Sequence, residues 1–341
     1  MNREERNKQV ANYWSWVADR GELGYWNLPG WDKHQNLLAS GNPHRGWLDV
    51  LGQKVIESVG NDGLVLSLGC GSGSLEPLLL SKGLCSRVEG CDISADLVAM
   101  AQQQADKNQL PIKYFQCDLN VPNFEKSKYN IVVAAGILHH VENLEGLFAN
   151  VKEALKPGGV FLVYDYIGPT RFQWTSEQTA ACNELLKEMP LRYRWKRGYP
   201  WYYVVARGAF NLMPWLRLGV VKKMAQRFLS NRQYCQFLRA KESRLLMNTV
   251  LPPPPEQFIV TDPSEAVRSE EILPLLRKCF QEEAMLPLGG TLIAPLFNRT
   301  VRNFIDNAKG KLLANNVLKR ERELIKNEAL PSDFVAVLMR K

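Results

Sequence analysis

The 341-residue chain lacks long apolar runs, and it lacks the cysteine and histidine patterns that are typical of metal sites. No window of about 18 residues is free of charge, which argues against a membrane-spanning helix. The first ten residues, MNREERNKQV, are charged where a secretory signal would be apolar. The seven cysteines form no CxxC pair and no cluster with the four histidines. We therefore expect a cytoplasmic protein with reduced cysteines and no metal site.

Positive charge is abundant, but only in one segment. Between Lys187 and Arg244, fourteen Lys or Arg stand against two Glu, so this segment carries +12 and the rest of the chain −4. Eleven aromatic residues lie in the same segment, and LPPPPEQF follows it at 251–258. Four prolines favour an extended spacer. Because a typical domain has about 150 residues, the length and this segment predict one core with a large basic, aromatic insertion.

Apolar strand-type runs alternate with helical patterns up to Pro169. Continuous apolar runs bounded by glycine or turn residues suit a parallel sheet that is covered on both faces. Strands are predicted at 64–69, 86–94, 112–119, 129–138 and 159–167, and helices from about Ser74, at 95–108 and at 144–155 before a KPGG turn. This alternation predicts a doubly wound, mostly parallel α/β sheet.

The alternation stops after Pro169 and resumes beyond the proline-rich stretch. Residues 170 to about 250 are helical in tendency. Beyond them, helices are predicted at 269–280, 289–308 and 311–329, and strands at 281–288 and 332–339. The last strand is expected to rejoin the sheet.

LVLSLGCGSGSLEPLL, residues 64–79, places three glycines directly after an apolar strand. Ligands bind at the carboxyl ends of strands in open α/β sheets, so the turn Gly69–Gly73 is the expected site. A dinucleotide fingerprint would need glycine at 74 or 76, where Ser74 and Glu76 stand, and a P-loop would need GK[ST]. Asp92 ends the next strand, where a carboxylate can accept both ribose hydroxyls. The helix N-terminus after the turn favours an anion, so a nucleoside with a carboxylate, such as S-adenosylmethionine, fits.

Four motifs follow one another along the core: LSLGCGSG, EGCDIS, QCDLN and YNIVVAAGILHHVENLEGLFANVKEALKPGGVFLV. Their order and intervals resemble the class I S-adenosylmethionine-dependent methyltransferase superfamily. The resemblance covers residues 45–168 well and the last eighty or so loosely, and it leaves the insertion out. It implies a Rossmann-like fold, S-adenosylmethionine as cofactor and methyl transfer as the activity.

The resemblance also implies roles for residues at the matching positions. Gly69, Gly71 and Gly73, with Cys70 between them, would line the methionine part of the cofactor. Asp92 and Ile93 would contact the ribose, and Asp118 and Leu119 would contact the adenine. Ala135 and Gly136 would form the wall beside the sulfonium. Ser67 stands where the family usually has an acidic residue, so the contact to the cofactor's amino group is left unassigned.

Four side chains at the ends of the fourth and fifth strands are candidates for a general base, namely His139, His140, Asp165 and Tyr166. Either histidine also fits a purely structural role. Methyl transfer is an in-line displacement in which alignment and desolvation supply most of the acceleration, so a base matters only for a hydroxyl acceptor. After the fourth strand the chain reads AAGIL, not the [DNS]PP[YF] that resembles the enzymes acting on nucleobase amines, and it has no Pro-Cys pair like that of the cytosine-C5 enzymes.

Charge and resemblance together predict four parts: a helical lid at 1–44, the cofactor-binding core at 45–169, a helical substrate cap at 170–258, and the rest of the core at 259–341. The expected reaction is methylation of a small-molecule or lipid-linked acceptor, most plausibly at a hydroxyl. An RNA methyltransferase and a non-catalytic cofactor-binding protein are the alternatives.

Segment 187–244 is also expected to contact an anionic membrane peripherally. A helix over 214–229 would place apolar residues on one face and Lys222, Lys223 and Arg227 on the other, as interfacial helices do. The same pattern fits an ordinary amphipathic helix packed on the core. Aromatic and basic residues also serve single-stranded nucleic acid, which fits less well here.

Overall fold

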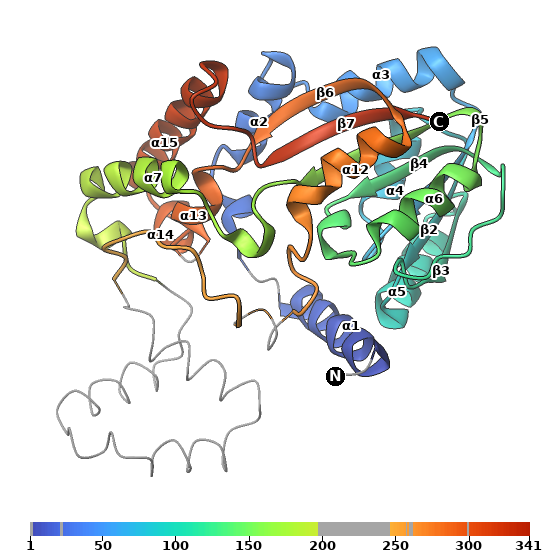
Figure 1. Ribbon diagram of the computed structural model, residues 1–341, viewed down its shortest axis with the longest axis horizontal. Coiled ribbons are helices and arrows are strands. Elements are labelled where there is room, and N and C mark those ends of the chain that lie inside the picture. Colours follow the sequence, from blue (N-terminus) through green and yellow to red (C-terminus); the bar gives the residue numbers. More distant parts are fainter. Residues whose placement is uncertain (1–2, 21–22, 197–245, 257, 259–261, 299) are drawn as a thin grey trace, which may run out of the picture.

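Seven strands form one sheet: β1 (Leu64–Leu68), β2 (Arg87–Asp92), β3 (Ile112–Gln116), β4 (Tyr129–Ala135), β5 (Leu155–Tyr166), β6 (Gln281–Gly289) and β7 (Phe334–Arg340). Their order across the sheet is β3-β2-β1-β4-β5-β7-β6 (Figure 1). The computed structural model describes residues 3–20, 23–196, 246–256, 258, 262–298 and 300–341. β1 to β5 are parallel, and β7 is antiparallel to both of its neighbours. The predicted doubly wound, mostly parallel sheet is confirmed, and the last strand does rejoin it.

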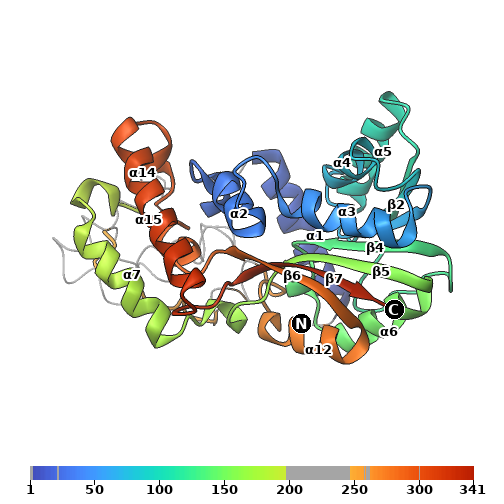
Figure 2. The same ribbon diagram turned by 90° about the horizontal axis from the view of Figure 1, so that it is seen from above.

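Helices cover both faces of the sheet (Figure 2). One face packs against α3 (Trp47–Val59), α4 (Leu75–Ser81) and α5 (Ala95–Lys107), and the other against α6 (Leu144–Ala154) and α12 (Ile272–Cys279). Side chains alternate along each strand, so Val65 packs in the core on the α3, α4 and α5 side of the sheet, and Leu66 packs in the core on the α6 and α12 side. Burial on both faces explains why the strands read as continuous apolar runs.

Two predicted elements differ from the structure. Lys156–Gly159, predicted as a turn, lies inside β5, where the pairing with β4 is irregular and Gly158 has a φ of +73°. The pairing is irregular in this stretch, but the strand continues through it. The helix predicted at 289–308 is broken into α13 (Ile293–Phe297) and α14 (Arg302–Ile305). Between them, the Thr300 hydroxyl donates to the Leu296 carbonyl at 2.7 Å and competes with helical bonding.

A third apolar core lies beside the sheet. It joins α7 (Ser176–Glu188), from the predicted insertion, to α13, α14 and α15 (Ala308–Lys326), which gather at the left of Figure 1. α2 (Trp31–Ser40) contacts both β6 and α15, and so connects this core to the sheet. The part of the insertion predicted to form the amphipathic helix at 214–229 lies outside the described residues.

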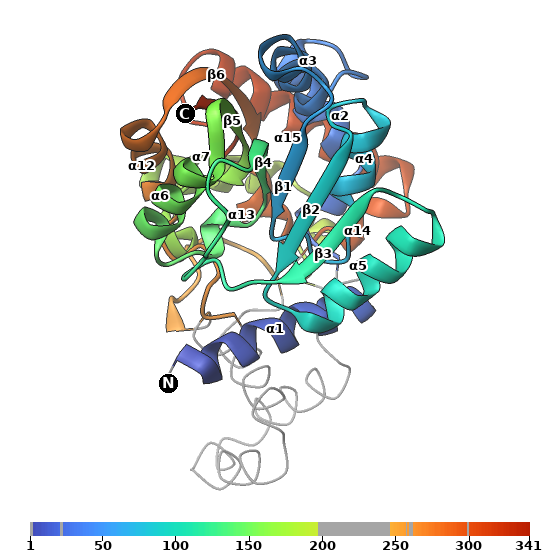
Figure 3. The ribbon, with the colours of Figure 1, turned by 90° about the vertical axis from the view of Figure 1, so that its right-hand side faces the viewer.

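The N-terminal helix α1 (Arg3–Arg20) lies next to α5 across the ends of β2 and β3 (Figure 3). Its Ser15 hydroxyl is 3.0 Å from that of Ser94, which follows β2. The structure has helices before residue 44, and their role as a lid stays a prediction. Among the described helices, none has the length and apolar content needed to cross a membrane.

Candidate functional site

The glycine turn between β1 and α4 has a backbone that other residues adopt only with strain. Gly69 and Gly73 have φ values of +65° and +82°. A Cβ at Gly69 would lie 2.3 Å from Ile137 Cγ1, and one at Gly73 would lie 2.7 Å from the Tyr114 hydroxyl. At Gly71 nothing lies within 4 Å of the same position, so that side of the turn is open. The turn therefore offers bare backbone to a ligand.

Asp92 lies at the carboxyl end of β2, next to this turn. Its carboxylate accepts the backbone N–H of Gly71 at 3.0 Å and of Ser94 at 2.9 Å. Burial raises its pKa, and these hydrogen bonds oppose that rise. Ile93 follows, and its carbonyl accepts from Gln116 at 2.9 Å. The turn and the carboxylate predicted to bind one cofactor are therefore directly bonded to each other.

A buried carboxylate that sequence reasoning missed lies beneath the turn. Glu76 is fully buried, and it accepts from the hydroxyls of Ser67 at 2.6 Å and Tyr114 at 3.2 Å. Burial raises its pKa. Ser67 occupies the position at which an acidic residue is usual in the resembling family. The structure brings a carboxylate to that place from α4, nine residues further along the chain.

Asp118, predicted to contact adenine, is already bonded to α1. Its Oδ2 accepts from Arg3 Nη2 at 2.6 Å and from Asn7 at 2.7 Å. Burial opposes ionisation, but these bonds and the N–H of Asn120 lower its pKa. The neighbouring Leu119 is buried in the core. A ligand amino group that reached this carboxylate would compete with α1.

The turn after β4 is fixed by hydrogen bonds to residues of β5. Asp165, at the end of β5, is fully buried and accepts the backbone N–H of Ile137 at 2.9 Å and of Leu138 at 2.8 Å. Gly136 donates its N–H to the Tyr164 carbonyl at 2.7 Å, and nothing lies within 4 Å of where its Cβ would be. Ala135, directly before it, is the last residue of β4. Asp165 thus fixes the backbone beside the predicted sulfonium position.

Two of the predicted catalytic residues, His139 and His140, meet a carboxylate from a distant part of the chain. His139 Nδ1 is 2.5 Å from Asp165 Oδ1, and its Nε2 is 3.6 Å from Glu265 Oε1. His140 Nδ1 is 3.1 Å from the Ser264 hydroxyl. One ligand atom from each of His139, His140 and Glu265 lies within 4.8 Å of the others. We call these three residues the His139 cluster.

Tyr166 lies apart from the cluster's polar atoms, because its hydroxyl donates to the Pro169 carbonyl at 3.2 Å and the residue is buried. Its ring is 6.3 Å from the His139 ring. Burial raises its pKa well above the usual value. Of the four candidate bases, only the two histidines belong to the cluster.

Burial and charge shift the cluster's pKa values in opposite directions. Burial alone would lower the pKa of His139, but Asp165, Glu265 and Asp262 raise it to about 9. Burial and the neighbouring charge of His139 lower the pKa of His140 well below its usual value. Burial raises the pKa of Glu265 to about 7. The environment therefore favours positive charge at His139.

The backbone around Glu265 is strained. Ala266, Arg171 and Phe172 have φ values of +47°, +54° and +53°, which cost of order 1–3 kcal/mol each in residues other than glycine. Arg171 donates to the carbonyls of Glu265 and Pro263, both at 2.7 Å. Such strain persists where the surrounding contacts enforce it. The contacts here hold Glu265 against His139.

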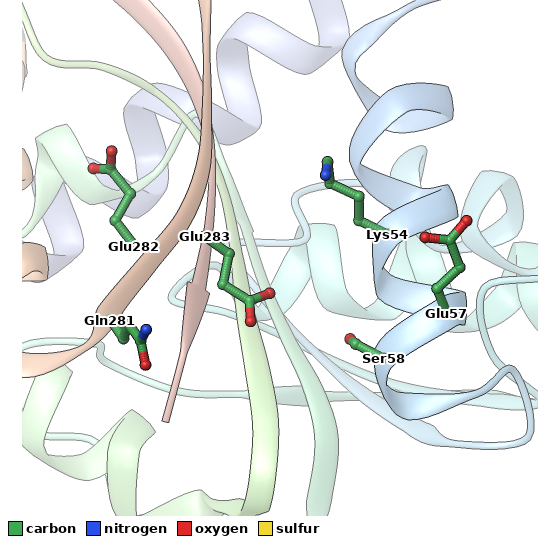
Figure 4. A pocket seen from close by; sticks show the side chains of 6 residues that line it. All are labelled: Lys54, Glu57, Ser58, Gln281, Glu282 and Glu283. Atoms are coloured by element: carbon green, nitrogen blue, oxygen red, sulfur yellow. The ribbon is translucent and has the colours of Figure 1, made fainter.

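A surface groove of about 510 Å³ lies elsewhere, between α3 and the edge strand β6 (Figure 4). Lys54, Glu57 and Ser58 line it from α3, and Gln281, Glu282 and Glu283 from β6. It lies near the amino ends of β1 and β5, whereas the predicted site residues lie at the carboxyl ends. The groove contains none of them.

Comparison with known proteins matches a region that contains part of the site. A family model described as a methyltransferase domain matches residues 65–159. A ubiquinone biosynthesis O-methyltransferase from Coxiella burnetii is 32% identical over 95 residues, which are 28% of this chain and 40% of the relative. A sterol 24-C-methyltransferase from Saccharomyces cerevisiae is 26% identical over 169 residues, 48% of this chain and 43% of the relative. The chain thus spans less than half the length of these curated relatives.

Among solved structures, geranyl diphosphate C-methyltransferase from Streptomyces coelicolor aligns with 98% of this chain and 97% of its own, at 12% identity and a TM-score of 0.46. The region matched by the family model runs from β1 into β5. It contains the glycine turn, Asp92, Asp118 and both histidines of the His139 cluster, and it ends before Asp165 and Glu265.

Proposed function

Residues 65–159 are a methyltransferase domain of the class I S-adenosylmethionine-dependent superfamily, and on that premise we propose that the chain methylates a hydroxyl of a small-molecule or lipid-linked acceptor. The observation that carries the proposal is the His139 cluster, which lies at the ends of β4 and β5, beside the open glycine backbone at Gly136. A hydroxyl must lose its proton on methylation, so it needs a polar group at this place.

The cofactor would bind along the ends of β1, β2 and β3. The bare backbone of Gly69–Gly73 and the N-terminus of α4 would receive its carboxylate, and Asp92 its ribose. Glu76, beneath the turn, would supply the negative charge for its ammonium group. Asp118 would accept from the adenine amino group once Arg3 releases it.

Methyl transfer would proceed by in-line displacement. A lone pair on the acceptor oxygen forms the new C–O bond, the methyl carbon's bond to sulfur breaks, and sulfur keeps that electron pair in S-adenosylhomocysteine. The hydroxyl proton would pass to the neutral imidazole of His140 or to the Glu265 carboxylate, because positive charge is already favoured at His139. Asp165 would act as a positioning residue, because its hydrogen bonds fix both the His139 ring and the backbone at 137–138. Alignment of the two reacting atoms supplies most of the acceleration.

The surroundings of the cluster on one side are aromatic. The His139 ring lies 6.3 Å from the ring of Tyr166, which is buried and packs 4.8 Å from Phe172 and 5.4 Å from Phe334. An apolar wall of this kind supports an acceptor with an apolar body. The named relatives include an O-methyltransferase and a C-methyltransferase. A polar cluster favours the hydroxyl, because a hydroxyl gains from a proton acceptor during the attack, whereas an alkene carbon attacks first and loses its proton only afterwards.

Isotope labelling can identify the acceptor directly. A host extract, incubated with the chain and S-adenosylmethionine labelled in its methyl group, should yield a labelled small molecule or lipid by mass spectrometry. Label on oxygen is expected. The Asp92→Ala variant in parallel controls for other enzymes, because it should lose cofactor affinity. Label only in RNA would support the RNA methyltransferase instead, and cofactor binding without any labelled product would support a non-catalytic protein.

A further inference from the structure

We propose that the His139 cluster binds a divalent transition-metal ion, with His139, His140 and Glu265 as its three protein ligands. Two imidazoles and one carboxylate are a ligand set that Zn²⁺ uses in proteins, and three protein ligands leave one position open, as in catalytic sites. The sequence predicted no metal site, because 125 residues separate His140 from Glu265 and no local spacing connects them.

The three ligand atoms are close enough to share one ion. Zn²⁺ bonds of about 2.0–2.2 Å place neighbouring ligand atoms roughly 3.4 Å apart in a tetrahedral site. His139 Nε2 and Glu265 Oε1 are 3.6 Å apart, and all three ligand atoms lie within 4.8 Å of one another. The His139–Glu265 pair is already near this spacing, and small rotations of the His140 and Glu265 side chains would bring all three atoms to bonding distance of one ion.

Both imidazoles are oriented by partners on their Nδ1 atoms. His139 Nδ1 contacts Asp165 at 2.5 Å, and His140 Nδ1 contacts the Ser264 hydroxyl at 3.1 Å. Ser264 in turn donates to Asp262 Oδ1 at 2.5 Å. Histidine ligands of metals nearly always use the second ring nitrogen in this way, with a carboxylate, a carbonyl or water. The two partners keep Nδ1 occupied and leave Nε2 of each ring for the ion.

The surroundings favour a cation at this place. The carboxylates of Asp165, Asp262 and Glu265 surround the two imidazoles, and Arg171 is directed to backbone carbonyls. Asp262 is fixed further by the Trp14 indole N–H at 3.0 Å. The strained segment at 171–172 and 266 holds Glu265 in place before an ion arrives. A prearranged, negatively charged ligand set reduces the cost of binding a divalent ion.

The role of such an ion rests on the proposed function, although its binding does not. In the open position it would receive the acceptor oxygen and lower the pKa of the hydroxyl. With the cluster's nitrogen and carboxylate atoms bound to the ion, the proton would leave to solvent instead of to the cluster. The oxygen lone pair would attack the methyl carbon, and the departing sulfur would keep the electrons of its broken bond. An acceptor with an accessible hydroxyl is therefore the chemical class that this site selects.

Titration of the full-length, chelator-treated chain with Zn²⁺ in a calorimeter tests the binding directly. We expect one Zn²⁺ per chain. Glu265→Gln should weaken binding at least 100-fold, and Ser264→Ala about 10–100-fold, the usual effect of losing an outer partner. His44→Ala is the matched control, since His44 is exposed and outside the cluster, and its affinity should equal that of the natural chain.

A second readout does not depend on the variants folding. Co²⁺ bound to the natural chain should give visible absorption bands of a site with nitrogen ligands, and added Zn²⁺ should remove them. Absence of stoichiometric binding by the natural chain, or binding that Glu265→Gln leaves unchanged, would overturn the proposal. Metal binding without any methyl transfer would support the metal site and count against the proposed function, whereas full methyl transfer by the metal-free chain would count against the ion's catalytic role.

Discussion

Asp92 shows how one side chain can serve both the fold and a ligand. Its two oxygens accept N–H groups from Gly71 in the glycine turn and from Ser94 before α5. Each carboxylate oxygen can accept more than one hydrogen bond, so both retain capacity for ribose hydroxyls. The side chain is already held at the end of β2, and a ribose would therefore bind without ordering it.

Replacing Asp92 with Ala should weaken S-adenosylmethionine binding by about 1.5–3 kcal/mol, the range for hydrogen bonds to a charged group. Calorimetry with the purified variant measures this. Asp96→Ala is the control, because Asp96 is exposed on the first turn of α5 nearby. Equal affinity of the Asp92 variant and the control would remove Asp92 from the cofactor site.

Glu76 is expected to act through its charge rather than through its hydrogen bonds. Glu76→Gln keeps the shape of the side chain and removes the charge, and it should weaken cofactor binding about tenfold, or about 1.4 kcal/mol. Tyr114→Phe removes one hydrogen bond to Glu76 and keeps the charge, so it should mainly lower the stability of the fold, by about 0.5–1.5 kcal/mol. Cofactor titration and urea unfolding of both variants separate the two effects. Equal losses of affinity in both variants would contradict a role for the charge.

Residues at strand ends could be predicted from the sequence, whereas their distant partners could not. Gly69, Asp92 and His139 follow apolar runs directly, so the strand pattern places them at one edge of the sheet. Glu265 and Ser264 follow the insertion and the proline-rich stretch, in a segment with no periodic pattern. Tertiary contacts bring that segment back to the end of β4, among them the Val267 N–H donated to the His139 carbonyl at 3.0 Å and the hydrogen bonds of Arg171.

Elements were predictable where one strong pattern decides them, and less so where side chains compete with the backbone. The five parallel strands have nearly the predicted bounds, because burial on both faces leaves continuous apolar runs. At the break between α13 and α14, the Thr300 hydroxyl bonds the Leu296 carbonyl, and residues of both helices pack in the third core. The helical periodicity of the sequence continues through this break, so the sequence pattern does not reveal the break.

Helix α1 is the element whose contacts most directly affect the proposed adenine position. Arg3→Ala should remove one of the two α1 side chains that bond Asp118 Oδ2 and leave only Asn7 there. Cofactor binding should then strengthen, by at most about fivefold, because an exposed ion pair is worth about 0.2–1 kcal/mol. Calorimetric titration of the variant measures this, and Arg45→Ala, an arginine away from α1 and Asp118, is the control. Weaker binding by the Arg3 variant would contradict the competition and would indicate that Arg3 supports the cofactor.

At the scale of the whole molecule, a buried polar joint connects the sheet to the third core. Asp333, which directly precedes β7, accepts from Gln178 on α7 at 3.0 Å, and Gln178 also donates to Thr291 at 2.7 Å. Asp333 is nearly fully buried, and Glu321 of α15 lies close enough to affect its charge. The joint therefore depends on the protonation of one carboxyl group.

This joint should make stability depend on pH. Burial and Glu321 raise the pKa of Asp333 to about 7, whereas an unfolded Asp titrates near 3.9. The folded state therefore holds a proton that the unfolded state releases, and the stabilisation present below pH 4 is lost as pH rises towards 7. Asp333→Asn should remove this loss, so its free energy of unfolding should exceed that of the natural chain at pH 7 but not at pH 4.

Urea unfolding at the two pH values measures the difference, which we expect to be a few kcal/mol at most, at about 1.4 kcal/mol per pKa unit. Tyr25, Tyr166 and Cys182 also lie within electrostatic reach of Asp333, but none of them titrates between pH 4 and 7 in this setting. Asp306→Asn, at an exposed position, is the control. A gap between the Asp333 variant and the natural chain that is the same at both pH values would contradict the assignment.

The basic, aromatic segment 187–244 is predicted from the sequence alone to contact an anionic membrane, because residues 197–245 lie outside the part of the chain that the structure describes. If the segment is interfacial, the chain should sediment with anionic vesicles at low salt and poorly with neutral ones, because apolar burial and charge attraction act together.

Reversing Lys222, Lys223 and Arg227 to Glu should abolish sedimentation, since each cation near such a surface contributes about 1 kcal/mol. The reversed variant should still bind S-adenosylmethionine, which separates loss of membrane contact from loss of fold. A lipid-linked acceptor would then be presented to the His139 cluster from the membrane. Failure of folded, cofactor-bound protein to sediment with anionic vesicles would contradict the membrane prediction and favour a freely diffusing acceptor. If the same reversal instead lowers affinity for RNA, the nucleic-acid alternative gains support.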